Sequence, residues 1–232
     1  MEDIQEEKYD VLVIGAGAAG MRAAIAASDE GASVCLVSKS LLGKAHTVMA
    51  EGGAAAALGN ADERDNWKVH FRDTIKGGKH LNNWKMAKIH AEQAPERILE
   101  LERWGAVFDR TKDGKINQRN FGGHRYPRLA HVGDRTGLEI IRTVQDKVIH
   151  QDNIDIFMEC TVATIITEDN QAVGALAYYR NNGEIVAIHA KAIVVATGGI
   201  GKAYRVTSNS WEYTGDGHSL AYLAGADLQL SL

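Results

Sequence analysis

The most constraining feature of the sequence is a short glycine-rich turn, GAGAAG, at residues 15–20. An apolar run rich in β-branched residues, Tyr9–Ile14, precedes it, and a strongly helix-forming segment, Met21–Ser28, follows. Residues 33–38 then read as a second strand, after Gly31 ends the helix. A G-x-G-x-x-G turn inside such a strand–helix–strand unit is typical of dinucleotide-binding folds.

The spacing of the three glycines has a physical basis. Gly15 permits the tight turn, Gly17 lets the backbone approach a pyrophosphate, and Gly20 lets the helix pack close to the sheet. Free N–H groups and the helix dipole then favour phosphate at the helix N-terminus. The sequence therefore predicts an α/β fold with a Rossmann-like, doubly wound sheet. The predicted cofactor contacts of the turn are Gly15, Ala16, Gly17, Ala18, Ala19 and Gly20.

The end of the second strand lacks the acidic residue that commonly binds a ribose hydroxyl in this fold. Ser38 and Lys39 stand there instead, and both are candidate cofactor contacts. A basic residue at this point suits a 2′-phosphate, so an NADP-linked reductase stays open, although no second G-x-G-x-x-G follows Gly20. The alternative is a flavin dinucleotide held in another way.

Composition excludes several classes of function. The net charge of −4 over 232 residues gives no sign of nucleic-acid binding, and no apolar run approaches the roughly 18 residues needed to span a membrane. The polar, acidic opening residues do not resemble a secretory or twin-arginine leader. Cys35 and Cys160 form no C-x-x-C pair, so we expect two buried, reduced thiols and no metal or iron–sulfur cluster in this chain.

A second motif, SKSLLGKAHTVMAEGG at residues 38–53, resembles the flavin-attachment segment of the succinate dehydrogenase and fumarate reductase flavoproteins. In that family the matching histidine is bonded covalently to the 8α carbon of FAD, which makes His46 the expected attachment residue. Soluble relatives such as L-aspartate oxidase keep the glycines but lack this histidine. The resemblance extends the expected cofactor contacts to Ala45, Thr47, Glu51, Gly52 and Gly53. A carboxylate at Glu51 would lower the flavin potential, which favours a low-potential quinone.

The resemblance covers nearly the whole chain. QRNFGG matches the loop whose phenylalanine flanks the dicarboxylate site, so Phe121 and Gly53 are expected substrate contacts, and GDRTG matches the opening of the next helix. In the family, the segment matching Thr161 to Ala163 runs past the adenine of FAD. Ala163, Thr197, Gly198 and Asp216 are the remaining expected FAD contacts; a plain helix N-cap is the alternative role for Asp216. Arg125, Arg128 and Arg135 are expected to be surface or structural cations.

Local patterns predict the other elements. Residues 66–104 read as helices, with Pro95 at a helix start, Gly105 as a C-terminal stop, and Leu99 and Trp104 in the core. His70, His80 and His90 lack metal-ligand spacing and are expected to be surface or satisfied structural residues. Asp113-Gly114 predicts a hairpin turn. Residues 154–196 read as an inserted antiparallel β-meander, and residues 218–224 as a helix.

The family chain is longer than this one. Residues 1–232 are expected to be its FAD-binding domain alone, truncated before the capping domain and the C-terminal helical domain, because no H-P-T-G stretch occurs. The proton-transferring arginine belongs to the capping domain, so no catalytic residue is expected here, and this fragment is expected to be inactive alone.

The resemblance implies a succinate dehydrogenase flavoprotein subunit, an enzyme of electron transport and the tricarboxylic acid cycle. The whole enzyme would oxidise succinate to fumarate with FAD. Electrons would pass to an iron–sulfur subunit and then to quinone, and membrane anchor subunits would hold the complex on the inner, cytoplasmic face of the cell membrane. The alternatives are a fumarate reductase, which is the same chemistry reversed, and a truncated, non-catalytic FAD-binding module.

Overall fold

The computed structural model describes residues 4–228, and the chain divides into two compact units. The first unit comprises the chain up to Thr47 together with Val144–Leu228, and the second comprises Val48–Thr143.

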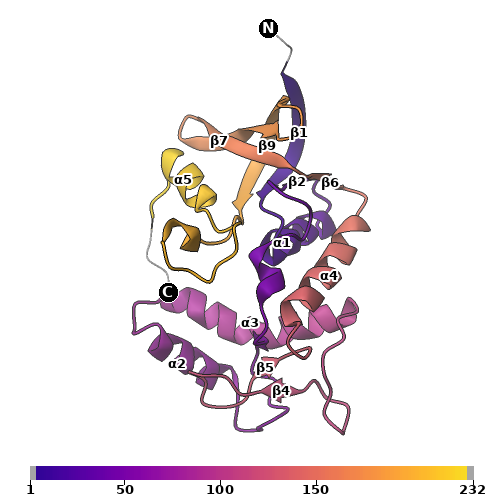
Figure 1. The fold of residues 1–232 in the computed structure, drawn as a ribbon, viewed down its shortest axis with the longest axis vertical. Coiled ribbons are helices and arrows are strands. Elements are labelled where there is room, and N and C mark those ends of the chain that lie inside the picture. Colours follow the sequence, from indigo (N-terminus) through magenta and orange to yellow (C-terminus); the bar gives the residue numbers. More distant parts are fainter. Residues whose placement is uncertain (1–3, 229–232) are drawn as a thin grey trace. The chain divides into compact units, whose positions relative to one another are not determined.

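The first unit is built on a six-stranded mixed sheet (Figure 1). Its strands lie in the order β6-β2-β1-β9-β8-β7. The first four of these are parallel, and β9, β8 and β7 form an antiparallel meander. The meander is shorter than predicted, because a turn at residues 158–159 separates residues 154–157 from it and these pair parallel with β2 instead. The strands are β1 (Gln5–Ile14), β2 (Val34–Val37), β6 (Ile154–Phe157), β7 (Cys160–Glu168), β8 (Gln171–Tyr179) and β9 (Ile185–Val195). The α/β fold class predicted from the glycine-rich turn is confirmed.

The register of the central strands determines where a ligand can bind. Ile14 of β1 lies opposite Val37 of β2 on one side and Val195 of β9 on the other. The carboxyl ends of these three parallel strands therefore meet at one edge of the sheet. The chain passes from β1 to β2 on one side of it, whereas the neighbour on the other side, β9, comes much later in the sequence. This edge is therefore a topological switch point, where open α/β sheets bind ligands.

Helices cover this sheet and follow its strands. Helix α1 (Ala18–Asp29) packs against β1 and β2, and α5 (Asp216–Leu223) lies against β7 (Figure 1). Helix α4 (Thr136–Ile149) and the 3-10 turn η1 (His46–Met49) begin in one unit and end in the other, and a second 3-10 turn, η2, spans Gly201–Ala203.

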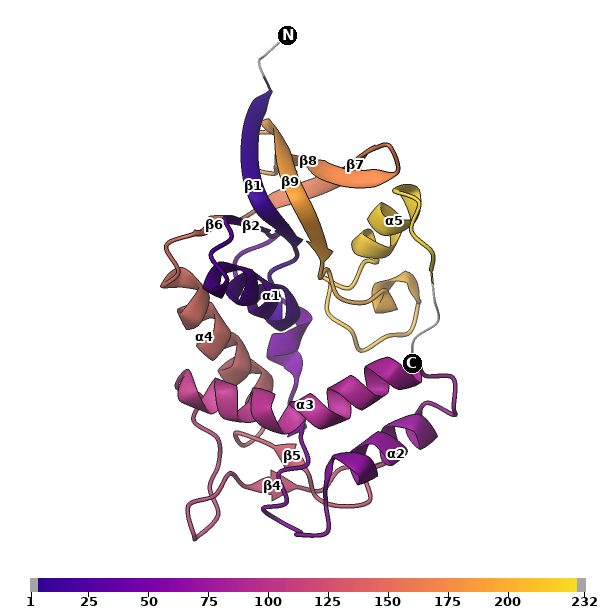
Figure 2. The same ribbon diagram turned by 180° about the vertical axis from the view of Figure 1, so that it is seen from behind.

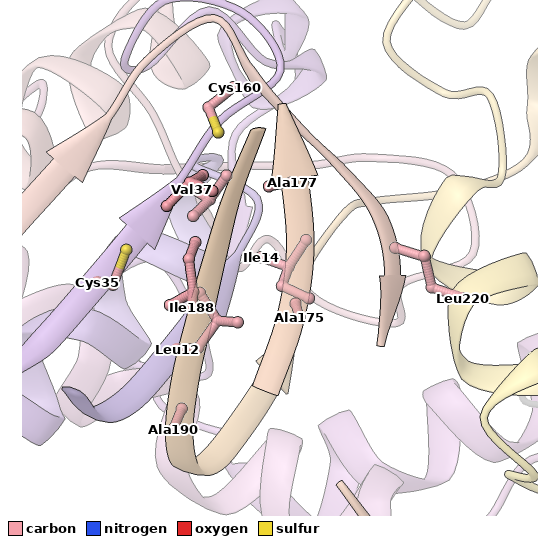
Figure 3. Packing of buried hydrophobic residues seen from close by; sticks show 11 residues of the cluster. Leu12, Ile14, Cys35, Val37, Cys160, Ala175, Ala177, Ile188, Ala190 and Leu220 are labelled. Atoms are coloured by element: carbon pink, nitrogen blue, oxygen red, sulfur yellow. The ribbon is translucent and has the colours of Figure 1, made fainter. Parts of the chain in front are cut away.

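Alternate residues of the strands make the core of the first unit (Figure 3). Leu12 and Ile14 of β1 pack with Val37 of β2 and Ile188 of β9, as the two-residue period of a strand requires. Cys35 and Cys160 belong to the same cluster. Both are buried free thiols, as predicted, and burial raises the pKa of each, for Cys160 to about 11.

The second unit contains two long helices and a small sheet. Helix α2 spans Trp67–Gly77 and α3 spans Trp84–Arg103; the three-stranded sheet is formed by β3 (Ala54–Ala55), β5 (Leu129–Ala130) and β4 (Gln118–Arg119). The side chains of Asn66 and Asn83 cap the two helices by accepting hydrogen bonds from first-turn amides. Ile98, Phe108 and Ile116 are central to its core.

Two predictions for the middle of the chain are wrong. Pro95 lies inside α3 rather than at its start, because the helix begins at the Asn83 cap and stays in register with buried residues on both sides of the proline, Ala91 and Ile98. Leu99 is 36% exposed and Trp104 is half-buried, so neither is a core residue. The predicted hairpin turn is confirmed, because the Gly114 amide donates to the Thr111 carbonyl.

Candidate functional site

A cavity of about 230 Å³ opens at the switch point of the first unit. It is lined by the segments that follow β1, β2 and β9, by the start of β7 and by the start of α5. The predicted residues on its wall are Gly15, Ala16, Gly17, Ala18, Ala19, Ser38, Lys39, Ala45, His46, Thr47, Thr197, Gly198 and Asp216. Segments spread over two hundred residues of sequence thus converge on one site.

The glycine-rich turn has the close approaches expected from its spacing. Gly15 has a φ of +110°, and a Cβ on it would lie 2.4 Å from the Ala196 carbonyl oxygen. Gly20 does not line the cavity; a Cβ there would lie 1.7 Å from the Gly15 carbonyl oxygen, so this residue holds helix and turn together. Side chains at either position would push apart the wall against which a dinucleotide must lie.

The N-terminus of α1 provides a place for phosphate. Gly17 is the N-cap, no side chain caps the helix start, and Ala18 and Ala19 both face the cavity. The first-turn amides are therefore not taken by a capping side chain, and with the helix dipole they favour an anion at this point. The cavity wall fits the pyrophosphate of a dinucleotide.

Lys39 has its charge neutralised within the site. Its Nζ lies 2.7 Å from Asp216 Oδ2 and 2.6 Å from Thr214 Oγ1, and Glu212 is 3.9 Å away. Burial alone would raise the pKa of Asp216, but hydrogen bonds from Lys39 and Thr214 and the Lys39 charge lower it overall. Lys39 is thus already paired, which disfavours the 2′-phosphate of NADP. Asp216 is the first residue of α5, and Gly215 is its N-cap.

His46 stands in the cavity wall with a fixed ring orientation. Its Nδ1 accepts a hydrogen bond from the Ser210 amide at 3.1 Å, and its ring centroid lies 4.3 Å from that of Tyr213. Because Nδ1 is occupied by the Ser210 amide, Nε2 is the ring nitrogen left for further chemistry.

Several lining residues were not predicted from the sequence. Tyr213 covers the turn after β9, where a Cβ on Gly198 would lie 2.6 Å from its ring. Cys160 of β7 also lines the cavity. It is followed by the expected segment 161–163, of which Thr161 and Val162 line the cavity and Ala163 is exposed just beyond them. Other unpredicted lining residues are Ser40, Lys44 and Glu212. The stretch WEYTGDG, immediately before α5, was the only available signal for Glu212 and Tyr213.

The remaining predicted residues, Glu51, Gly52, Gly53 and Phe121, belong to the second unit. Phe121 is 58% exposed, so it is not a core aromatic, and its ring faces Gly52, where a Cβ would lie 3.5 Å away. Arg119 holds this segment: Nε donates to the Gly52 carbonyl at 2.7 Å and Nη2 to the Glu51 carbonyl, while Nη1 pairs with Asp134 at 3.0 Å. The loop that carries Phe121 is thereby tied to the segment that follows His46.

A second polar cluster of this unit is buried. Arg128 is fully buried and pairs with Asp65 and Asp73, each at 2.8 Å, which confirms its structural role. His70 is also buried, and its Nδ1 has no hydrogen-bond partner among residues 4–228, so it is neither the surface nor the satisfied histidine that the sequence suggested. Burial and then the Arg128 charge lower the pKa of His70 to about 4.

Comparison with known proteins identifies the family to which this fold belongs. Residues 10–231 match the model of an FAD binding domain. The chain superposes on the Sdh1 complex of Mycobacterium smegmatis in its apo form with a TM-score of 0.91 and 57% identity, covering 96% of this chain and 39% of the other.

Two curated relatives extend the comparison. The chain is 43% identical to a subunit of the fumarate reductase (CoM/CoB) of Methanothermobacter marburgensis, over 97% of this chain and 42% of the relative. It is 37% identical to the succinate dehydrogenase flavoprotein subunit of Rickettsia conorii, over 98% of this chain and 39% of that subunit. The chain thus spans about 40% of the length of these relatives.

Proposed function

This chain belongs to the FAD binding domain family that includes the flavoprotein subunits of succinate dehydrogenase and fumarate reductase, and on that premise we propose that it is the FAD-binding part of a succinate dehydrogenase flavoprotein subunit. The observation that carries the proposal is the presence of His46 in the wall of the same cavity as the glycine-rich turn and Asp216. A Rossmann-like turn alone indicates a dinucleotide; the histidine narrows the choice to one group of flavoproteins.

We propose that FAD is held covalently through His46. The Ser210 amide occupies Nδ1 and fixes the plane of the ring, and the contact with Tyr213 limits its tilt. Nε2 would then be the ring nitrogen that carries the bond to the flavin. Nδ1 would still accept from the Ser210 amide with the flavin in place, so the ring would not have to turn.

The other residues of the cavity position the cofactor. The α1 N-terminus and the turn before it would bind the pyrophosphate, Asp216 the sugar-like chain of the flavin, and Val162 and its neighbours the adenine side. FAD, when bound, supplies the two-electron chemistry of the reaction. Cavity residues align it and exclude water.

In the second unit, Gly53 and Phe121 are the proposed substrate contacts. Arg119 would keep both in place, because its guanidinium ties the segment before Gly53 to strand β4, two residues before Phe121. We assign no proton-transfer residue within these 232 residues, which form the FAD-binding domain of the proposal.

The relatives include a succinate dehydrogenase subunit and a fumarate reductase subunit, so fumarate reductase is the second candidate. The 57% identity to the mycobacterial Sdh1 chain favours succinate oxidation. Glu51, as a carboxylate near the flavin, would lower its potential and suit a low-potential quinone.

The partners follow from the family. Electrons would leave through an iron–sulfur subunit, and membrane anchor subunits would attach the assembly to the inner face of the cell membrane. Among residues 4–228, no helix is both long and apolar enough to cross a bilayer. Attachment through separate anchor subunits is the part of the proposal that rests on the family alone.

Steady-state kinetics of the enzyme purified from its source would test the reaction. We expect succinate to reduce an artificial acceptor faster than fumarate oxidises a reduced viologen dye. A reversed ratio would support the fumarate reductase. If neither dicarboxylate reacts although FAD is bound, the enzyme assignment is wrong and the protein is a non-catalytic FAD-binding module.

A further inference from the structure

A groove of about 740 Å³ runs along helix α2 of the second unit and reaches the start of α3. The two helices lie side by side (Figure 2). Its apolar floor comes from α2 residues spaced four apart, Trp67, Phe71 and Ile75, and from Trp84 at the start of α3. Residues at this spacing share one face of a helix. Trp84 is 58% exposed although it is among the largest apolar side chains of the chain.

A row of cations borders this floor. Lys68, Arg72 and Lys76 also repeat every four residues on α2, one position after each floor residue. Within residues 4–228, none of the three has a carboxylate within 4 Å. Lys88 of α3 completes the border, although it pairs with Glu92 at 3.1 Å.

The charge of this region differs from that of the chain. Residues 67–90 contain six Lys or Arg and one Asp, hence 6 − 1 = +5, whereas the whole chain has a net charge of −4. The single carboxylate, Asp73, pairs with buried Arg128 and so does not neutralise the groove. The cations of residues 67–90 are therefore left almost without acidic residues of the same region to neutralise them.

The groove combines an apolar floor with a cationic border. An apolar groove with a charged border on one side is typical of a protein interaction site rather than of free surface.

We propose that this groove binds an acidic amphipathic helix of a partner protein. Apolar side chains of that helix, at i, i+4 and i+7, would enter between Trp67, Phe71 and Trp84, and Asp or Glu on its flank would meet Lys68, Arg72 and Lys76. The floor extends from residue 67 to 75, about 12 Å of helix, which fits roughly two turns of a partner. A concave floor between two helices suits a helix better than the flat surface of a bilayer.

Photo-crosslinking would test the groove in the full protein in its source cells. Trp84 is replaced with p-benzoylphenylalanine, the cells are irradiated, and the crosslinked segment is sequenced by mass spectrometry. We expect one major adduct, in a segment of another protein that has net negative charge and apolar residues at helical spacing. The triple variant Lys68→Glu, Arg72→Glu, Lys76→Glu should reduce its yield about tenfold, since three exposed ion pairs together contribute on the order of 1–2 kcal/mol.

The matched control carries the same change in charge elsewhere, with Lys8→Glu, Lys112→Glu and Arg205→Glu, all at exposed positions. It should leave the yield unchanged, and circular dichroism should show that both triple variants are folded. The proposal is overturned by a lipid, a nucleic acid or a second copy of this chain as the main adduct, by no adduct, or by equal loss in the two triple variants.

Discussion

At the scale of a residue, Arg128 is the largest fully buried side chain among the described residues. Its charge is fully buried between Asp65 and Asp73, and removing one partner of a buried ionic network leaves the others uncompensated. Arg128→Met should therefore lower the free energy of unfolding by about 3–5 kcal/mol. Urea unfolding followed by tryptophan fluorescence measures this, because Trp67, Trp84 and Trp104 lie in this unit.

A compensated variant separates the lost charge from lost packing. Adding Asp65→Asn and Asp73→Asn to Arg128→Met removes the unpaired carboxylates and should recover more than half of the loss. If the triple variant is less stable than Arg128→Met alone, the carboxylates are not what destabilises the single variant.

The lowered pKa of His70 should make the free energy of unfolding of the second unit depend on pH. Burial, Arg128, and the nearby His90 and His124 lower its pKa from 6.5 to about 4, against a smaller opposing effect of Asp73. The unfolded chain binds the proton more readily, so the stabilisation is complete above pH 6.5 and is lost as the pH falls toward 4. Replacing His70 with Phe should flatten the pH dependence of the urea midpoint across this range. An unchanged slope would assign it to other groups.

Site residues could be predicted from the sequence where a motif fixes the backbone. The turn at 15–20 and the segment around His46 have spacings that few other structures require. Tyr213 could not be predicted because it reaches the cavity through a loop whose position depends on tertiary packing. His70 was misjudged because its burial depends on contacts with loops far away in sequence.

At the scale of an element, α3 is the exception to helix rules. Pro95 lies in its interior, where it provides no N–H and costs up to about 3 kcal/mol relative to Ala. Pro95→Ala should therefore raise the urea midpoint of the second unit. A lower midpoint would mean that the proline packs in a way that alanine cannot replace.

Elements with strong local signals were predicted well. The strands of the meander are separated by turns whose residues tolerate positive φ. Asp169 and Asn170, between β7 and β8, both have positive φ in the structure. The sequence wrongly predicts a helix start at Pro95 within α3, because proline is common in the first turn of a helix. The Asn83 cap overrode it, since capping and burial along the whole helix outweigh one missing hydrogen bond.

At the scale of the whole molecule, the central fact is that β1 pairs with both β2 and β9. The second pairing joins Ile14 to Val195, and no local pattern in the sequence specifies such a distant partner. That pairing brings the segment after β9, and with it α5 and Asp216, to the cavity that the turn and His46 already line. The division into two compact units was also not predicted from the sequence.

The central claim is that His46 holds FAD covalently in this cavity. The most direct measurement is the mass of the denatured protein purified from its source, followed by mapping of its tryptic peptides. The account predicts a mass increased by one FAD, with the flavin on the peptide that contains His46, and no increase in a His46→Ala variant that still binds FAD reversibly. Flavin attached elsewhere, or flavin released completely on denaturation of the native enzyme, would contradict it.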